Sequence, residues 1–418
     1  MSRRMYTFLL FLLLPFTPLK LLWRARKQPE YLAHWRERYG FYSLALTKPV
    51  IWLHCVSVGE TRAAEPLIKA LLHQYPNYQI LLTHTTPTGR ATSEQLFGNA
   101  VTRVYLPYDL PFAVNRFLHH FKPAVGVLME TELWFNLIAA CKQQALPLLL
   151  VNARLSEKSA RGYAKLGPLV KQGLHQLAAI AAQNTQDAQR LMNLGASNVS
   201  VVGNLKFDVV PPEGAATQGK LLRDIFGQQR PVFLAASTRD GEEILILEAI
   251  AKANIPDLLT VIVPRHPQRF TEVAELLKKQ RIQFVQRSTL TEDIIPKNIA
   301  CVLGDSMGEM FTYYAACDVA FIGGSLLPLG GQNLIEACSM GKPVLIGPHT
   351  FNFELVTELA IDAGAAKRVQ NSDELSQSIK TLFENQTKRQ AMGYAAQSFS
   401  AQSRGATQRT MGLIEPYI

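Results

Sequence analysis

The sequence has few cysteines and none of the spacings that mark a zinc site or a disulfide framework. Its five cysteines among 418 residues are scattered, odd in number and never at C-x-x-C spacing. Neither a structural metal site nor a set of disulfides follows from this pattern, and reduced thiols in a core are expected. Such thiols suit a catalytic body in the cytoplasm.

Several motifs of catalysis are also missing from the sequence. It has no Asp-x-Asp, no H-E-x-x-H and no cluster of Cys and His, so nothing visible requires a metal. The absence of G-x-S-x-G counts against an α/β-hydrolase. No repeat and no low-complexity stretch is present, which argues against a solenoid, a propeller or a disordered chain.

Positive charge and length are what the sequence has in excess. The net charge of +10 at pH 7 predicts an anionic partner, for which nucleic acid, anionic lipid and a phosphorylated substrate all qualify. A chain of 418 residues is too long for one ordinary core, so two or three domains are expected.

The N-terminus carries one long apolar segment. Residues 5–23 are mostly apolar and are followed by a basic cluster at residues 24–27, where a signal peptide would have a small-residue cleavage motif. We interpret residues 1–27 as a membrane anchor with the larger body on the cytoplasmic side. Whether it spans the membrane or lies on its surface stays open, and the alternative is a buried helix packed on the protein.

Short apolar runs alternate with amphipathic stretches from residue 49 onward, which predicts β-α-β units and parallel sheets covered on both faces. A Pro/Gly-rich passage interrupts the rhythm before it restarts. We therefore predict an α/β protein with two Rossmann-like domains facing a cleft. The predicted boundaries are an anchor at 1–27, an N-terminal domain at 28–208, a linker at 209–230 and a C-terminal domain at 231–418.

Two acidic segments stand just past predicted strands of the first domain, where ligands of such sheets bind. Glu60 follows Ser57-Val-Gly and reads either as a helix-start carboxylate or as a general base. Glu130 and Glu132 leave the strand predicted at residues 124–129 and read either as helix-start charge or as paired acids that tune each other's protonation or hold a polar substrate.

Two further segments occupy the same position in the second domain. Arg265 at the end of a strand can fork onto a phosphate or carboxylate, and His266 beside it is either a hydrogen-bond donor or structural. The segment 323–336 holds two glycine pairs, whose backbone amides can approach an anion. Asn333 and Glu336 within it have the spacing of a capping box.

Taken together, these segments resemble the bacterial 3-deoxy-D-manno-oct-2-ulosonic acid (Kdo) transferases, which have the glycosyltransferase B fold. The resemblance covers nearly the whole chain, and its specificity lies in the order and spacing of the motifs. The matching segments are Glu37-Arg-Tyr-Gly-Phe-Tyr42, His54-Cys-Val-Ser-Val-Gly-Glu60, Tyr105–Leu110, Met129–Trp134, Val151–Ser156, Gly203–Asp208, Val263–Pro267 and Gly323–Glu336.

The resemblance implies an activity and a set of site residues. It implies inverting, metal-independent transfer of Kdo from CMP-Kdo to lipid IVA in lipopolysaccharide synthesis, at the cytoplasmic face of the bacterial inner membrane. Glu60 would be the general base, and Glu130 and Lys206 would stabilise the transition state. The nucleotide would be held by Arg265, His266, Met307, Gly308, Glu309, Asn333, Leu334, Ile335 and Glu336.

The implied partners are CMP-Kdo as co-substrate, lipid IVA and anionic inner-membrane lipids, with no nucleic acid and no cofactor or metal. One alternative is another enzyme on the same fold, such as a UDP-sugar transferase or a nucleotide-sugar epimerase. The other is a membrane-tethered protein whose basic face binds nucleic acid, which explains the charge but leaves Glu60, Glu130 and the glycine-rich segment without a role.

Overall fold

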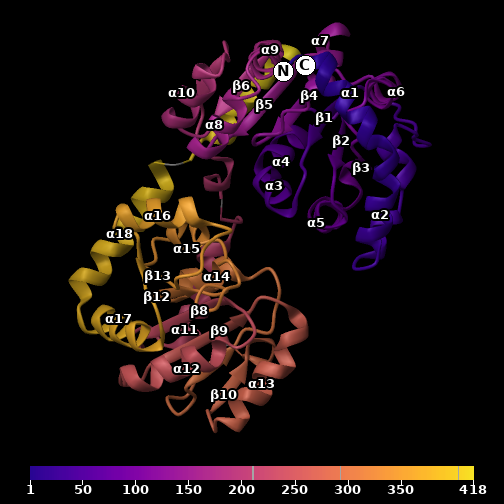
Figure 1. Cartoon of the computed structure of the whole chain (residues 1–418). Helices are drawn as coiled ribbons and strands as arrows, with labels where there is room; N and C mark the ends of the chain where they lie inside the picture. Colours follow the sequence, from indigo (N-terminus) through magenta and orange to yellow (C-terminus); the bar gives the residue numbers. More distant parts are fainter. Residues whose placement is uncertain (210, 292, 403) are drawn as a thin grey trace. The chain divides into compact units, whose positions relative to one another are not determined.

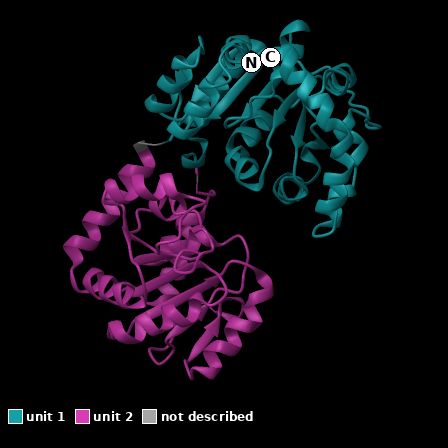
Figure 2. Ribbon diagram, viewed as in Figure 1, with its two compact units in different colours: residues 1–208, 403–418 teal, residues 209–402 magenta. Residues whose placement is uncertain are grey.

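Two seven-stranded parallel sheets organise the chain, which confirms the predicted α/β architecture. The computed structural model describes residues 1–209, 211–291, 293–402 and 404–418. It divides into two units, residues 1–208 with 403–418 and residues 209–402 (Figure 2). Each unit consists of one sheet and the helices that cover it (Figure 1).

The first sheet has the strand order β3-β2-β1-β4-β5-β6-β7, and all its pairings are parallel. The short apolar runs of this part of the sequence form strands, as predicted. The strands are β1 (Val50–His54), β2 (Gln79–His84), β3 (Thr102–Tyr105), β4 (Val125–Met129), β5 (Leu148–Ala153), β6 (Ala179–Ala182) and β7 (Val199–Val201).

Strand β1 shows why this sheet needs helices on both faces. Val50 and Trp52 belong to one buried cluster, whereas Ile51 and Leu53 belong to another. Successive side chains of a strand point to opposite faces, so an unbroken apolar run requires cover on both sides. The first unit supplies that cover with α3 (Val58–Ala63), α4 (Glu65–Gln74), α5 (Pro87–Phe97), α6 (Pro111–Phe121), α7 (Phe135–Gln143), α8 (Glu157–Ala164), α9 (Pro168–Gln176), α10 (Thr185–Asn193) and α19 (Ala406–Ile414), with the short 3-10 turns η2 (Pro29–Leu32), η3 (Trp35–Tyr39), η4 (Gly98–Ala100), η5 (Leu205–Phe207) and η8 (Glu415–Tyr417).

The second sheet has the order β10-β11-β9-β8-β12-β13-β14. Its strands are β8 (Val232–Thr238), β9 (Leu259–Pro264), β10 (Phe284–Gln286), β11 (Cys301–Leu303), β12 (Val319–Ile322), β13 (Val344–Ile346) and β14 (Ala366–Arg368). Sequence reasoning missed the two edge strands, β10 and β14. Each has only three residues, and both are partly exposed, so neither carries an apolar run long enough to be recognised.

The predicted linker at 209–230 is corrected by the structure. It contains α11 (Ala215–Phe226), which packs on α14 (Met310–Ala316) within the second unit. A Cβ at Gly219 would lie 2.1 Å from the Cβ of Ala315, so this glycine permits close helix packing. The other helices of the unit are α12 (Glu242–Ala253), α13 (Phe270–Lys279), α15 (Ile335–Ser339), α16 (Glu354–Asp362), α17 (Ser372–Glu384) and α18 (Gln386–Gln402), with η6 (Pro267–Arg269) and η7 (Arg287–Thr289).

The C-terminal boundary is also corrected, because the end of the chain belongs to the first unit. Helix α19 buries Ala406, Met411 and Ile414 in one of the two clusters that cover the first sheet. Asp208 accepts hydrogen bonds from the amides of Gly405, at 2.6 Å, and of Thr407. An amphipathic helix is stable where its apolar face is buried, and this one is buried against the first sheet.

The N-terminal helices lie against the first unit and expose most of their apolar side chains. Helix α1 (Arg3–Leu13), η1 (Leu14–Phe16) and α2 (Thr17–Ala25) form one helical run. Within the described residues, this run, Arg3–Ala25, is long and apolar enough to cross a membrane by length and composition. The predicted alternative of a buried helix is wrong, because α1 has no buried residue and α2 has only Leu21.

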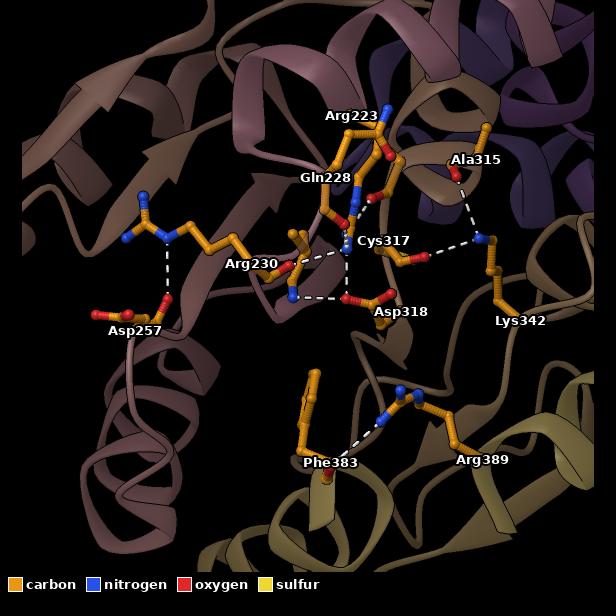
Figure 3. Close-up of polar contacts among 12 residues, drawn as sticks. Arg223, Gln228, Arg230, Asp257, Ala315, Cys317, Asp318, Lys342, Phe383 and Arg389 are labelled. Carbon is orange, nitrogen blue, oxygen red and sulfur yellow. Dashed lines mark hydrogen bonds and ion pairs between the residues drawn. The ribbon is translucent and has the colours of Figure 1, made fainter. Parts of the chain in front are cut away.

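Arginine and lysine side chains form hydrogen bonds at the amino-terminal edge of the second sheet (Figure 3). Arg223 donates to the carbonyls of Ala316 and Arg230 and pairs with Asp318 at 3.1 Å. Arg230 in turn donates to the carbonyl of Asp257 at 2.9 Å. These cations satisfy carbonyl groups at the edge of the sheet, which is a structural use of positive charge.

Candidate functional site

The order of the first sheet brings Glu60 and Glu130 to one edge. The chain runs from β1 through β2 to β3 on one side, then crosses to β4 on the other, which makes the carboxyl ends of β1 and β4 a topological switch point. Ligands of open parallel sheets bind in the crevice at such a point. Glu60 lies in the helix that follows β1, and Glu130 directly follows β4.

Glu60 is held in place by the turn between β1 and α3. Its carboxylate accepts hydrogen bonds from the amide of Val56 at 2.7 Å and from the hydroxyl of Ser57 at 3.0 Å. The hydroxyl oxygen of Ser57 accepts from the amide of Glu60, so the two residues form a capping arrangement at the start of α3. The helix-start interpretation therefore describes the contacts of Glu60 correctly, and it does not exclude a second role as a base.

The surroundings of Glu60 make it a much stronger base than an exposed glutamate. Burial raises its pKa from 4.5 to about 8; the carboxylates of Glu132 and Glu130 act in the same direction, against the hydrogen bonds from Val56 and Ser57. A general base works best when its pKa lies near the working pH. The carboxyl of Glu60 meets that condition in a side chain that is only 8% exposed.

Glu130 and Glu132 do not cap a helix, so the helix-start interpretation of these residues is wrong. Helix α7 begins at Phe135 and has no acidic residue in its first turn. Glu130 has a left-handed backbone with φ of 56°, and its carboxylate lies 3.9 Å from the ammonium of Lys206. Glu132 accepts from the indole of Trp134 at 2.9 Å, and burial raises its pKa.

The segment that carries Lys206 is positioned by Asn152, which sequence reasoning missed. The buried amide oxygen of Asn152 accepts from the backbone amide of Leu205 at 3.1 Å. Asn152 has φ of 53°, at a shift in the register between β5 and β6. Its carbonyl accepts from Gln183, whose own amide oxygen accepts from Asn204 at 3.1 Å. A strained, buried residue with these partners fixes the turn η5 and so the position of Lys206.

In the second unit, Arg265 and His266 lie directly after β9, as predicted. His266 is mostly exposed, and burial, followed by the charges of Arg239, Arg265 and Arg269, lowers its pKa. Neighbouring positive charge therefore gathers at this end of the sheet, which suits an anionic ligand.

The segment Met307–Glu309 follows β11 and precedes α14. Met307 is 61% exposed, and Gly308 has φ of 83°. Glu309 accepts from Arg287 at 2.8 Å and from the hydroxyl of Ser306. Strand β11 pairs with β9, so this segment reaches the same edge of the sheet as Arg265 and His266.

The segment Asn333–Glu336 opens helix α15, but the predicted capping box is wrong. Leu334 occupies the N-cap position, and the side chain of Asn333 accepts from the amide of Ile335, two residues on. Leu334 and Ile335 are fully buried, so only their backbones can meet a ligand. The charges of Glu336 and Arg265 both act on the buried hydroxyl of Tyr314, which links this segment to the end of β9.

The glycine-rich segment does hold an anion, and that anion is part of the chain. The carboxylate of Glu242, which is fully buried, accepts from the amides of Gly324, Ser325 and Leu326 and from the amide of Arg239. Sequence reasoning missed Glu242, since an acidic residue at a helix start has no signal that separates this contact from ordinary capping. These amides are therefore already engaged by Glu242.

No group of three His, Cys, Asp or Glu side chains arranged to hold a metal ion is found among the residues that the structure describes. All five cysteines are buried and free, as the scattered spacing predicted.

Comparison with known proteins assigns both halves of the chain. Residues 33–209 match the family described as 3-deoxy-D-manno-octulosonic-acid transferase, and residues 242–399 match glycosyl transferases group 1. The 3-deoxy-D-manno-octulosonic acid transferase of Bordetella pertussis is 43% identical over 96% of both chains. That of Haemophilus influenzae is 38% identical over 94% of this chain and 93% of its own.

A solved structure adds the fold. MurG of Acinetobacter baumannii superposes with a TM-score of 0.56 at 14% identity, over 88% of this chain and all of that one. The two parallel sheets and this likeness define a glycosyltransferase of the B fold. Within that class, the chain belongs to the 3-deoxy-D-manno-octulosonic-acid (Kdo) transferase family. The resemblance seen in the sequence motifs is thereby confirmed.

Proposed function

We propose that the chain transfers Kdo from CMP-Kdo to lipid IVA in lipopolysaccharide synthesis, with inversion at the anomeric carbon and without a metal. The observation that carries this proposal is Glu60, a buried carboxyl at the switch point of the first sheet with a pKa of about 8. Membership of the family identifies the sugar as Kdo, and the position and basicity of Glu60 support the proposed mechanism.

The proposed reaction is a single displacement. Ionised Glu60 removes the proton from an acceptor hydroxyl as its oxygen attacks the anomeric carbon of the donor sugar. The bond from that carbon to the phosphate oxygen breaks, and CMP leaves with both electrons. One attack on the face opposite the leaving group inverts the carbon, and a base on the acceptor side is the group that this chemistry needs.

Lys206 and Glu130 act together in this proposal. The 3.9 Å contact between their charged groups orients the ammonium of Lys206 at the same sheet edge as Glu60. Charge develops on the departing phosphate as the glycosidic bond breaks, and a preorganised cation stabilises it. In this proposal Glu130, at a left-handed backbone position ahead of α7, directs the ammonium of Lys206.

The nucleotide is proposed to bind at the carboxyl ends of β9, β11 and β12. Arg265 and His266 meet the phosphate, and Met307-Gly-Glu309 and Asn333–Glu336 hold the nucleoside. A phosphate ester with one negative charge can be balanced by an arginine and by hydrogen-bond donors, so the chemistry does not call for a divalent cation.

Attachment to the inner membrane is proposed to occur through α1 and α2, with the helical run lying on the cytoplasmic surface. One face is tied to the body: Tyr6 donates to Asp109 at 2.9 Å, and Thr7 donates to Asn136 at 2.8 Å. The opposite face exposes large apolar side chains and is flanked by basic residues, as in helices that lie in a membrane interface. The exposed apolar residues are Met5, Phe8, Leu9, Phe11, Leu12, Leu13, Phe16, Leu19, Leu22 and Trp23.

A transfer assay tests the proposed function directly. Purified chain incubated with CMP-Kdo and lipid IVA should release CMP and give lipid whose mass has increased by one or more Kdo residues. Glu60→Gln should lose this activity, whereas Glu65→Gln, which removes a carboxylate paired with Lys69 on the next helix, should retain it. Wild-type turnover by Glu60→Gln would remove Glu60 from the role of base.

Nucleotide preference separates the proposal from its rivals. A bound nucleotide stabilises the folded state, so CMP should raise the melting temperature more than UDP at equal concentration. Stronger protection by UDP would favour a UDP-sugar transferase or an epimerase on this fold. Salt-sensitive binding to DNA that exceeds binding to CMP would favour the nucleic-acid alternative.

A further inference from the structure

The switch point of the second sheet lies between β8 and β12. The chain runs from β8 through β9 to one side and from β12 through β13 to the other, so the carboxyl ends of β8 and β12 border a crevice in this type of sheet. The segment after β8 contains Arg239, and the segment after β12 begins with Gly323 and Gly324. Arg239 therefore occupies the central position for ligand binding in this unit, although neither motif nor resemblance assigned it a role.

Close backbone packing and hydrogen bonds position the backbone around Arg239. A Cβ at Gly323 would lie 2.5 Å from the carbonyl oxygen of Ser237, so the two strand ends touch through their backbones. Ser237 has a left-handed φ of 56°. The buried carboxylate of Glu242 accepts from the amide of Arg239 at 2.9 Å and from the amides that follow Gly323. These contacts fix the position of the Cα of Arg239, from which its side chain extends.

The positive charge of Arg239 is not neutralised by the protein. Among the residues that the structure describes, its guanidinium forms no hydrogen bond and no ion pair. Arg269, on the neighbouring segment, donates to Glu243 at 2.6 Å and also pairs with Asp240 and Glu272. Arg223 and Arg230 at the opposite edge of the sheet are likewise engaged (Figure 3).

One close approach and one electrostatic effect show where the Arg239 side chain lies. Its Cγ is 3.4 Å from the position that a Cβ would take at Gly324. Its charge also lowers the pKa of His266, after the larger effect of burial. The Arg239 side chain thus starts beside the glycine-rich segment, and its backbone adjoins the proposed phosphate ligands, since the carbonyl of Thr238 accepts from the amide of Arg265 at 2.9 Å. A half-buried arginine left unpaired at a ligand-binding edge indicates an anionic group on the ligand.

We propose that Arg239 binds the carboxylate of the donor sugar and selects sugar acids over neutral sugars. This assignment rests on the proposed function. A 2-ulosonic acid carries its carboxylate on the same anomeric carbon that bears the phosphate in the nucleotide sugar. The ligand for that carboxylate must therefore lie next to the ligands for the phosphate. Arg239 meets this condition, because Thr238, directly before it, pairs with Pro264 and accepts a hydrogen bond from the amide of Arg265 at 2.9 Å.

The geometry of the guanidinium explains the selectivity. A planar guanidinium can donate two parallel hydrogen bonds to a planar carboxylate, whereas a hexose without the acid offers only hydroxyl groups. A nucleotide sugar without a carboxylate would leave the buried part of Arg239 without its anion, which disfavours binding. The sugar acid is thus recognised by charge, at a point beside the reacting carbon.

The experiment compares a ligand that has the carboxylate with one that lacks it. Arg239→Gln, Arg239→Lys and the control Arg281→Gln, an exposed arginine of the same unit, are measured for the KM of CMP-Kdo and for the Kd of CMP. Losing a charge-assisted pair should raise the KM for CMP-Kdo by about 10–100-fold in Arg239→Gln. The Kd for CMP should stay within about threefold, since CMP lacks the carboxylate.

The controls separate a binding role from a structural role. Arg239→Lys should recover part of the loss, because it retains the charge without the paired hydrogen bonds. The melting temperature of Arg239→Gln should equal that of Arg281→Gln. Equal losses for CMP and CMP-Kdo, or no loss for either, would overturn the assignment to the carboxylate. A wild-type chain that neither binds nor uses CMP-Kdo would instead refute the proposed function itself.

Discussion

Replacing Glu60 by Gln should stabilise the protein at neutral and alkaline pH while removing the candidate base. The folded chain raises the pKa of Glu60 from 4.5 to about 8. Between these values the folded chain retains a proton that the unfolded chain has released. Stability contributed by protonated Glu60 is therefore present at acidic pH and is lost as the pH rises from about 5 to about 8.

The magnitude follows from the two pKa values. Each pH unit in this interval lowers the unfolding free energy by about 1.4 kcal/mol. Relative to acidic pH, Glu60 therefore destabilises the folded chain by about 1 kcal/mol at pH 5 and about 3 kcal/mol at pH 7. This destabilisation approaches about 5 kcal/mol above pH 8. Glutamine is neutral at every pH, keeps an acceptor for the amide of Val56 and therefore avoids this cost.

The assay is thermal unfolding of matched variants across the pH range. Glu60→Gln should melt within a few degrees of the wild type at about pH 5 and roughly 5–10 °C above it at about pH 8. Glu65→Gln, which removes a carboxylate already paired with Lys69, should show no gain that grows with pH. The raised pKa would be refuted if the difference in melting temperature between Glu60→Gln and the wild type did not change with pH. A Glu60→Gln variant less stable than the wild type at pH 8 would also refute it.

Four further predictions concern the site. The kcat/KM for transfer should rise about tenfold per pH unit below pH 8 and level off above it, because Glu60 must be ionised; a profile flat from pH 6 to 9 would contradict this. Asn152→Ala should unfold about 1 kcal/mol more easily than Asn152→Gly in urea, since only glycine adopts the left-handed backbone at φ of 53° without strain. Both variants should lower kcat more than KM, as each releases the turn that carries Lys206; a change in KM alone would argue against that role. Glu242→Ala should destabilise the second unit by about 3 kcal/mol or more and weaken CMP binding, because it leaves four amides without an acceptor; a neutral effect on the melting temperature would be inconsistent with the observed contacts. Transfer should persist in excess EDTA, and activity that EDTA abolishes and Mg²⁺ restores would show that the metal-independent mechanism is wrong.

The fold was predictable because its strongest signals are local. Buried parallel strands such as β1 and β8 are unbroken apolar runs between amphipathic helices, and such runs are visible in the sequence. Two features of the fold could not be predicted, because neither is marked by a local apolar run. The edge strands β10 and β14 are too short to form a run, and the return of α19 to the first unit depends on contacts between residues about 200 positions apart.

The acidic side chains of the first unit were located from the sequence, but their environment was not. Glu60 and Glu130 each follow a predicted strand, and the carboxyl ends of parallel strands lie at one edge of the sheet. Their position in the sequence therefore predicted that both reach this edge. The raised pKa of Glu60 depends on burial and on two other carboxylates, which only the folded chain brings together. The helix-start position of Glu60 was predicted, although its capping contact with Ser57 was not, and the capping box predicted at Asn333 was wrong because α15 begins one residue later.

The sequence did not reveal the role of the residues that hold the site in shape, even though Asn152 lies within a segment that carries the resemblance. Asn152 lies in an apolar strand where its amide reads as an interruption, and its partner Leu205 is more than 50 residues away. Glu242 looks like an ordinary helix-start acid, although it binds the amides of a loop more than 80 residues later in the chain. Long-range hydrogen bonds of this kind become apparent only when the strands are placed in order.

The central claim is that Glu60 removes the proton from the acceptor while donor binding is independent of it. The most direct test is the single-turnover rate of Kdo transfer to lipid IVA at pH 8, with saturating CMP-Kdo, for wild type and Glu60→Gln. We predict that Glu60→Gln binds CMP as the wild type does and transfers Kdo about 10²–10⁴-fold more slowly. A variant that transfers at the wild-type rate would contradict the claim.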